Sequence, residues 1–207
     1  MSSDFAKRMP GRSISIMDAL LTSTIIVALA EMGDKTQLLA IVLATRFRAP
    51  WPIILGIFVA TIANHFLAAL LGSQAAAFLD GVWFRYAVAA SFIAMAIWTL
   101  VPDKLEDEAD KPARFGAFLT TLIAFFIVEM GDKTQIATIA LGARFHEVIP
   151  VTIGTTVGMM LANVPAVFLG NELVKRIPLR VVHMIAAALF FAIGVWLLAQ
   201  TAGWLGH

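Results

Sequence analysis

The sequence has no cysteine in its 207 residues and few charged residues, which make up 14% of the chain. The absence of cysteine excludes a disulfide framework, a thiolate metal site and a catalytic thiol. Soluble domains carry about 25% charged residues, so a water-soluble fold is disfavoured. The formal net charge is only +1, and the basic residues never gather into the stripe that a nucleic-acid-binding surface needs. Apolar sequence takes the place of charge, since 60% of the residues are hydrophobic.

Long apolar runs predict an all-α integral membrane protein with six transmembrane helices. A helix needs about 20 apolar residues to cross a bilayer, and six stretches of this kind are present. They cover residues 17–45, 51–71, 82–101, 115–144, 149–170 and 180–202. Proline, glycine or charged residues mark the breaks between them. The one sizeable polar segment, residues 102–114, is rich in acidic residues and is predicted to be a solvated linker.

Two charged motifs interrupt the first and the fourth of these runs. Both read Glu-Met-Gly-Asp-Lys-Thr-Gln, at residues 31–37 and 129–135. A charged side chain near the centre of a membrane helix costs roughly 2.5–3.5 kcal/mol on insertion scales. Charges kept at such a cost indicate an ion pathway or an ion-binding site.

The motifs belong to a longer internal repeat with an offset of 98 residues. Residues 31–47 match residues 129–145 at 11 of 17 positions. The match reaches the later spans through three further pairs: Gly56 with Gly154, Gly72 with Gly170, and Trp98 with Trp196. All three spans of each half therefore correspond to one another.

This repeat predicts one transmembrane domain made of two three-helix units. The first unit is expected at residues 1–101 and the second at 115–207, joined by the acidic linker at 102–114. Because three is an odd number of spans, the second unit must be inverted relative to the first. Inversion would bring the two motifs together near the membrane midplane, where transporters place their sites.

The acidic residues of the motifs are candidate ligands of a divalent cation. On a helix Glu31 and Asp34 share a face, and Glu129 and Asp132 repeat that arrangement. Hard cations such as Mn²⁺, Ca²⁺ and Mg²⁺ prefer oxygen ligands. Further side-chain oxygen atoms come from Thr36, Gln37, Thr134 and Gln135.

The glycines between the acids, Gly33 and Gly131, would permit a local unwinding that exposes backbone carbonyl groups to the cation. The four histidines are dispersed along the chain, which argues against a zinc or copper site. No nucleophile with a nearby base and no cofactor loop is visible, so an enzyme is disfavoured. We therefore expect the cation to be a transported substrate, with no cofactor.

Lys35 and Lys133 are candidate internal counter-ions. Each follows a motif glutamate by four residues, so we expect Lys35 to pair with Glu31, and Lys133 with Glu129, within one helix when the cation is absent. Two carboxylates close together in an apolar surrounding also favour a bound proton, which an arriving cation displaces. This competition would support metal/proton exchange by alternating access.

Two other interpretations of the motifs stay open. They could be salt bridges in a non-transporting scaffold, although two acids for each lysine leave a negative charge that a scaffold does not need. A passive channel for divalent cations could also use the same acids. In the neighbouring spans, Asn64, His65 and Asn163 are expected to form hydrogen bonds between helices in preference to binding the cation.

With its doubled motif the chain resembles the Gdt1-like family, also called UPF0016. The hallmark of that family is two copies of Glu-x-Gly-Asp followed by Lys and Thr or Ser, and both copies match here, at residues 31–36 and 129–134. The resemblance covers nearly the whole chain. It implies a secondary transporter of Mn²⁺ and Ca²⁺ that exchanges them for protons. It also implies that the four motif acids bind the cation, with the lysines and threonines in supporting roles.

The absence of an organellar targeting extension predicts a bacterial inner-membrane exporter of Mn²⁺, with Ca²⁺ as the second candidate. Outside the motifs, odd-numbered loops carry more Lys and Arg than the N-terminus and the even-numbered loops. The positive-inside rule then predicts a cytoplasmic linker and external termini. The expected partners are divalent cations, protons and the lipid bilayer.

Overall fold

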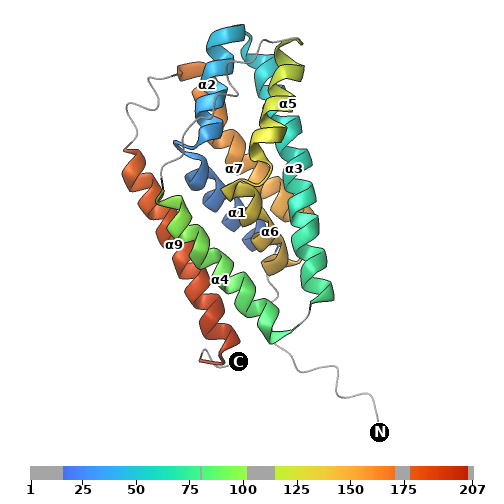
Figure 1. Ribbon diagram of the computed structural model, residues 1–207, viewed down its shortest axis with the longest axis vertical. Helices are drawn as coiled ribbons and strands as arrows, with labels where there is room; N and C mark the ends of the chain where they lie inside the picture. The colour runs from blue at the N-terminus through green and yellow to red at the C-terminus, as the bar shows by residue number, and fades with distance from the viewer. Residues whose placement is uncertain (1–15, 80, 102–114, 171–177, 205–207) are drawn as a thin grey trace.

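The computed structural model describes residues 16–79, 81–101, 115–170 and 178–204, and all the regular structure within them is helical. Figure 1 shows the described helices, which are α1 Ile16–Glu31, α2 Lys35–Phe47, α3 Pro50–Phe78, α4 Val82–Thr99, α5 Ala117–Glu129, α6 Lys133–Phe145, α7 Val148–Leu169 and α9 Leu179–Thr201. The predicted linker at 102–114 lies outside the described residues, as does the basic N-terminal segment.

The described helices are those of an integral membrane protein. Helices α3, α4, α7 and α9 are long and apolar enough to cross a membrane, and α1 with α2 passes the same test as one span bent by 68°. Helix α5 is apolar but has only 13 residues. The spans predicted at 17–45 and 115–144 are thus not single helices. Each of these stretches is divided into two helices at its charged motif.

Each break is built by the motif itself. Gly33 and Gly131 have positive φ angles of 81° and 77°, a region that residues with a Cβ atom rarely adopt. The backbone N–H of Gly33 donates to Gln37 Oε1 at 2.9 Å, and that of Gly131 donates to Gln135 Oε1 at 2.7 Å. These glutamines satisfy backbone groups that a broken helix leaves without an intrahelical partner. The predicted unwinding at the two glycines is confirmed.

The helices of the two halves pack mainly against each other. Helix α1 packs most extensively on α7, α3 packs on α5, α6 and α7, and α4 packs on α9. In Figure 1 the α4–α9 pair runs along one side of the group formed by the other helices. The rings of Phe92 and Phe190 meet at 6.2 Å between α4 and α9. Neither half therefore forms a separate bundle.

Small residues bring the backbones of these helices into direct contact at equivalent places. A Cβ atom on Gly154 of α7 would lie 2.5 Å from the carbonyl oxygen of Leu20 and 2.9 Å from Cβ of Ser23, both on α1. A Cβ atom on Gly56 of α3 would lie 2.8 Å from the carbonyl oxygen of Phe118 and 2.9 Å from Cβ of Thr121, both on α5. The residues of the first contact lie 98 positions from their counterparts in the second. The two halves therefore use equivalent glycines for close contact between helices.

Candidate functional site

The two broken helices place their charged motifs side by side. Helix α1 contacts α6 and α2 contacts α5, so the two breaks meet inside the bundle. Lys35 Nζ lies 3.3 Å from Asp132 Oδ1, and Lys133 Nζ lies 3.8 Å from Asp34 Oδ1. The ion pairs thus join one motif to the other. The predicted pairs within a single helix are wrong, because the chain leaves the helix after Glu31 and the four-residue spacing no longer puts its lysine beside it.

Three of the four motif acids form a compact buried cluster. Glu31, Asp34 and Asp132 each offer a carboxylate oxygen, and these atoms lie within 4.8 Å of one another. Glu31 is the last residue of α1, whereas Asp34 and Asp132 are the N-cap residues of α2 and α6. The prediction that Glu31 and Asp34 share one helix face is therefore wrong. The helix break, not the helix, brings them together.

Hydroxyl groups from both motifs bind Glu31. Thr36 donates to Glu31 Oε2, and Thr134 of the other motif donates to Glu31 Oε1. Both threonines are buried, as is the glutamate. Thr36 and Thr134 were predicted to supply oxygen atoms to a cation, and the structure places their hydroxyl groups beside the acid cluster.

The fourth acid, Glu129, lies outside this cluster and has different partners. Thr61 donates to Glu129 Oε1 at 2.8 Å, and Asn64 Nδ2 donates to Glu129 Oε2 at 3.0 Å. Both partners lie on α3, one helical turn apart, and Asn64 also donates to the Phe126 carbonyl at 3.1 Å. The predicted inter-helix hydrogen bond of Asn64 is confirmed. Thr61 was missed, because the sequence does not show which neighbour a threonine in a membrane helix faces.

The motif glutamines act on the backbone. Their Oε1 atoms accept from Gly33 and Gly131, as described above, and Gln37 Nε2 donates to the Ala162 carbonyl of α7 at 2.9 Å. Ala162 lies in the turn before Pro165, where polar side chains commonly support a helix that proline has weakened. In this structure Gln37 and Gln135 shape the breaks, and their role as cation ligands stays a prediction.

The remaining polar candidates do not join the cluster. Asn163 Nδ2 donates to the Met159 carbonyl at 3.1 Å within its own helix, so its predicted inter-helix bond is wrong. His65 is buried, and neither ring nitrogen has a hydrogen-bond partner among the described residues. A contact that the sequence did not indicate comes from α9, where His183 Nε2 lies 2.7 Å from the Met32 carbonyl oxygen at the first break. This contact joins the α4–α9 pair to the first helix break.

The chemistry of the cluster suits a hard divalent cation. Its donors are carboxylate and hydroxyl oxygens, which such cations prefer, and no histidine or sulfur atom takes part among the described residues. Asp34 and Asp132 also lie at helix N-termini, whose partial positive charge favours negative side chains. The two motif lysines neutralise only part of the negative charge of the four motif acids.

Comparison with known proteins identifies the family. A family model described as "Divalent cation/proton antiporter GDT1" matches residues 19–107 and 117–204. The chain belongs to the GDT1 family. Each matched segment contains one complete motif, so the GDT1 model covers all the residues of the acid cluster.

Similar proteins occur in bacteria, plants and a yeast. A protein of Vibrio cholerae serotype O1, provisionally named a manganese exporter, is 48% identical over 176 residues, which cover 84% of this chain and 88% of the relative. A GDT1-like protein of Synechocystis is 29% identical over 87% of this chain and 96% of its own length. GDT1-like protein 5 of Arabidopsis thaliana is 28% identical over 87% of this chain and 95% of its own length. No solved structure matches the chain.

Proposed function

We propose that this protein exports Mn²⁺ from the cytoplasm in exchange for protons, with Ca²⁺ as the second candidate substrate. The observation that carries the proposal is the buried cluster of Glu31, Asp34 and Asp132 between two broken helices. Burying acids inside a membrane bundle costs free energy, and acids kept there commonly mark a site or pathway for an ion. The family description supports exchange of a divalent cation for protons. The name of the Vibrio cholerae relative supports manganese and the direction of transport.

In the proposed cycle the lysines and the cation compete for the same carboxylates. Lys35 and Lys133 contact Asp132 and Asp34 in the present conformation. An entering cation would bind the three clustered carboxylates and the hydroxyl oxygens of the two motif threonines, and would displace the ammonium groups. Protons would compete for the same oxygen atoms, because a buried carboxylate needs either a cation or a proton. Exchange follows if the two ions reach the site from opposite sides.

We also propose that the chain has six spans arranged as two inverted repeats, as transporters of this kind commonly have. The pair α1–α2 would form the first span and α5–α6 the fourth. The equivalent glycine contacts of α7 with α1 and of α3 with α5 support this symmetry. Rocking of one repeat against the other would open the acid cluster to each side in turn. We place the chain in a bacterial inner membrane, and the positive-inside rule favours a cytoplasmic acidic linker and external termini.

The test is cation flux into proteoliposomes that hold the purified protein, with and without an imposed pH gradient. We expect Mn²⁺ flux that depends on the gradient and falls at least about tenfold in Glu31→Gln and Asp132→Asn, because each change removes a charged ligand. Glu147→Gln is the matched control, since Glu147 is exposed at the N-cap of α7 and should keep normal flux. Folded protein that moves neither Mn²⁺ nor Ca²⁺ would reject the proposal.

One observation favours a second candidate, a scaffold in which the motifs hold the bundle together. The ion pairs Lys35–Asp132 and Lys133–Asp34 join the two halves, as structural salt bridges would. In a scaffold, Glu31→Gln and Asp132→Asn would lower the thermal stability and there would be no flux to lose. A passive channel is separated by the same assay, because its flux would not require a proton gradient.

A further inference from the structure

The α4–α9 pair packs against only one of two equivalent sets of helices. The repeat of 98 residues makes α1 equivalent to α5, α2 to α6, and α4 to α9. In the structure α9 packs on α1, and α4 packs on α6. The equivalent packing, of α4 on α5 and of α9 on α2, is not present between these described helices. The two repeats therefore do not surround the α4–α9 pair in the same way.

Helices α4 and α9 hold each other closely. A Cβ atom on Gly194 of α9 would lie 2.7 Å from Cγ1 of Ile93 and 3.0 Å from the carbonyl oxygen of Ala89, both on α4. The other helices are joined to one another by the glycine contacts of α7 with α1 and of α3 with α5. A movement of the α4–α9 pair along the other helices would leave both sets of close contacts intact.

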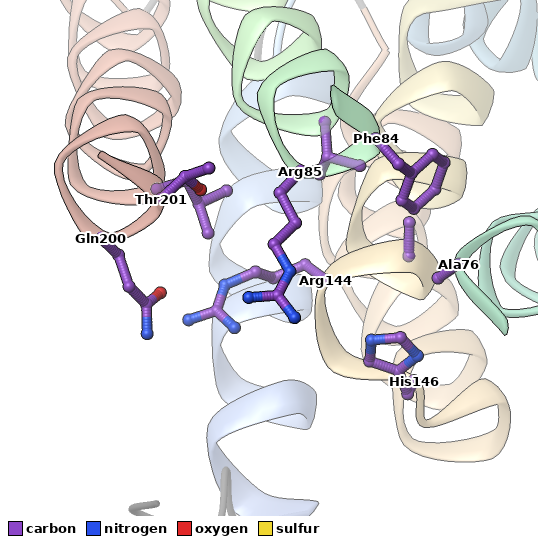
Figure 2. Close-up of a pocket in the computed structure, with 10 residues that line it drawn as sticks. Ala76, Phe84, Arg85, Arg144, His146, Gln200 and Thr201 are labelled. Carbon is purple, nitrogen blue, oxygen red and sulfur yellow. The ribbon is translucent and has the colours of Figure 1, made fainter. Parts of the chain in front are cut away.

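One contact between the pair and the other helices uses residues that both repeats share. The Arg144 guanidinium of α6 lies 4.5 Å from the ring centroid of Trp196 on α9, which is a cation–π contact. Figure 2 shows Arg144 reaching from α6 towards the last turn of α9, where Gln200 and Thr201 line the same pocket of about 280 Å³. Arg144 therefore attracts α9 in the present position of the pair.

The equivalent residues of the first repeat are Arg46 and Trp98, each 98 positions earlier. They lie in the last turns of α2 and α4, and Figure 1 shows the end of α2 well above the end of α4. The two arginines have like surroundings on their own helices. Arg46 lies 5.6 Å from the ring centroid of Phe47, and Arg144 lies 5.7 Å from that of Phe145. Both partners of the Arg144–Trp196 contact are thus repeated, on helices whose ends are apart in the present structure.

We propose that Arg144–Trp196 and Arg46–Trp98 are alternative contacts, each made in one of two access states of the transporter. In the present state the α4–α9 pair lies beside α1 and α6, and Arg144 holds Trp196. In the other state the pair lies beside α2 and α5, Arg46 holds Trp98, and Arg144 releases Trp196. This inference rests on the proposed transport function and names the part that moves, one helix from each repeat.

The movement would change which side of the acid cluster is covered. Helix α1 ends at the first break and α6 begins at the second, so these two helices lie on one side of the cluster, whereas α2 and α5 lie on the other. A pair that moves from α1 and α6 to α2 and α5 passes both breaks. Such a movement would expose the cluster to each side of the membrane in turn, as alternating access requires.

The test uses the full chain in proteoliposomes, with spin labels attached at Trp51→Cys and Leu100→Cys. The chain has no cysteine of its own, so only these two positions take up the label. Both are exposed, Trp51 in the first turn of α3 just after α2 and Leu100 at the end of α4. Double electron–electron resonance measures the distance between the labels, which shortens when α4 moves towards the end of α2.

The variants Trp196→Leu and Trp98→Leu are each added to the labelled chain. Both tryptophans are partly exposed, so we expect both variants to fold. Trp196→Leu should raise the population at the shorter distance and Trp98→Leu should lower it, each by about threefold, because each variant removes the cation–π contact of one state. Trp83→Leu is the control and should change nothing, since Trp83 is exposed on α4 and belongs to neither contact.

A distance distribution that Trp196→Leu leaves unchanged, or a shift in the same direction in both variants, would overturn the inference. Mn²⁺ flux through the unlabelled variants separates it from the proposed function. Normal flux with one fixed distance rejects the alternative contacts and leaves transport standing. Opposite shifts without flux of Mn²⁺ or Ca²⁺ support the movement of the pair and reject the proposed substrates.

Discussion

At the scale of single residues, Glu31 and Glu129 occupy equivalent positions in the two repeats but have different surroundings. Both hydroxyl donors of Glu31 come from the motifs, whereas the donors of Glu129 come from α3. The positions on α7 that correspond to Thr61 and Asn64 are Met159 and Ala162, which cannot donate from their side chains. Glu129 is therefore held by donors from a neighbouring long helix, whereas Glu31 is held by the motif threonines alone.

Removing the hydrogen-bond donors of α3 should disturb Glu129 specifically. We expect Thr61→Val and Asn64→Leu each to lower the free energy of unfolding by about 1–3 kcal/mol, because a buried carboxylate loses a hydrogen-bond donor. Mn²⁺ flux should fall as well, since the acid is no longer held in position. Chemical unfolding and proteoliposome flux provide the two measurements.

Thr155→Val is the matched control for this prediction. Thr155 is fully buried on α7, but its hydroxyl bonds only to carbonyl groups of its own helix. Equal flux in Thr61→Val and Thr155→Val would show that the bond to Glu129 contributes nothing to transport.

The sequence identified the acids of the site but not their pairing. Charges inside apolar runs are conspicuous, so all four acids could be found without a structure. Thr61 could not, because a threonine in a membrane helix usually bonds to its own backbone and only tertiary packing shows which neighbour it faces. The lysine pairs were mispredicted for a related reason. A spacing of four residues predicts contact only where the helix is continuous.

At the scale of the elements, the decisive feature is the pair of helix breaks. Each break turns the chain between two short helices and directs an N-cap aspartate into the cluster. A continuous helix would satisfy its own backbone and would keep these acids on a helix surface. The positive φ angle of each glycine is the local condition for the turn.

We expect Gly131→Ala to lower stability by about 1–2 kcal/mol, because a Cβ atom is strained at that backbone conformation. The effect would come from the backbone alone, since a Cβ atom there meets nothing within 4 Å. Flux should fall with it. Gly116→Ala is the control, because Gly116 also has open space but a φ of −63°. Thermal unfolding and flux of both variants check the prediction, and identical behaviour would contradict it.

Most element boundaries were close to prediction, and the exceptions have physical causes. The span predicted at 180–202 is α9 at Leu179–Thr201. The span predicted at 51–71 continues to Phe78 as α3, past the polar residues Ser73 and Gln74. Gly72 packs against the backbone of α6 there. This tertiary contact supports helical turns beyond the point where the falling hydropathy predicts the end of the span.

At the scale of the whole molecule, the motif charges bear on the stoichiometry of exchange. Four motif carboxylates and two motif lysines leave a formal excess of two negative charges. One divalent cation or two protons would neutralise this excess. We therefore expect one divalent cation to exchange for two protons, so that transport moves no net charge across the membrane.

This expectation can be checked with a membrane potential imposed on proteoliposomes at a fixed pH gradient. Moving one net charge is worth about 2.3 kcal/mol per 100 mV, which would change the final cation gradient about fiftyfold. We expect the final Mn²⁺ gradient to be unchanged at either sign of the potential. A shift that follows the potential would contradict electroneutral exchange, and protein-free liposomes control for leakage.

The packing of α1 on α7 also sets the point in synthesis at which the bundle can assemble. A ribosome delivers Glu31 and Asp34 to the membrane well before it reaches Lys133, Thr134 or the start of α7 at Val148. During that interval Glu31 has Thr36 beside it, but the partners from the second motif, Thr134 for Glu31 and Lys133 for Asp34, have not yet been made. The site can therefore be complete only after the second half of the chain has been synthesised.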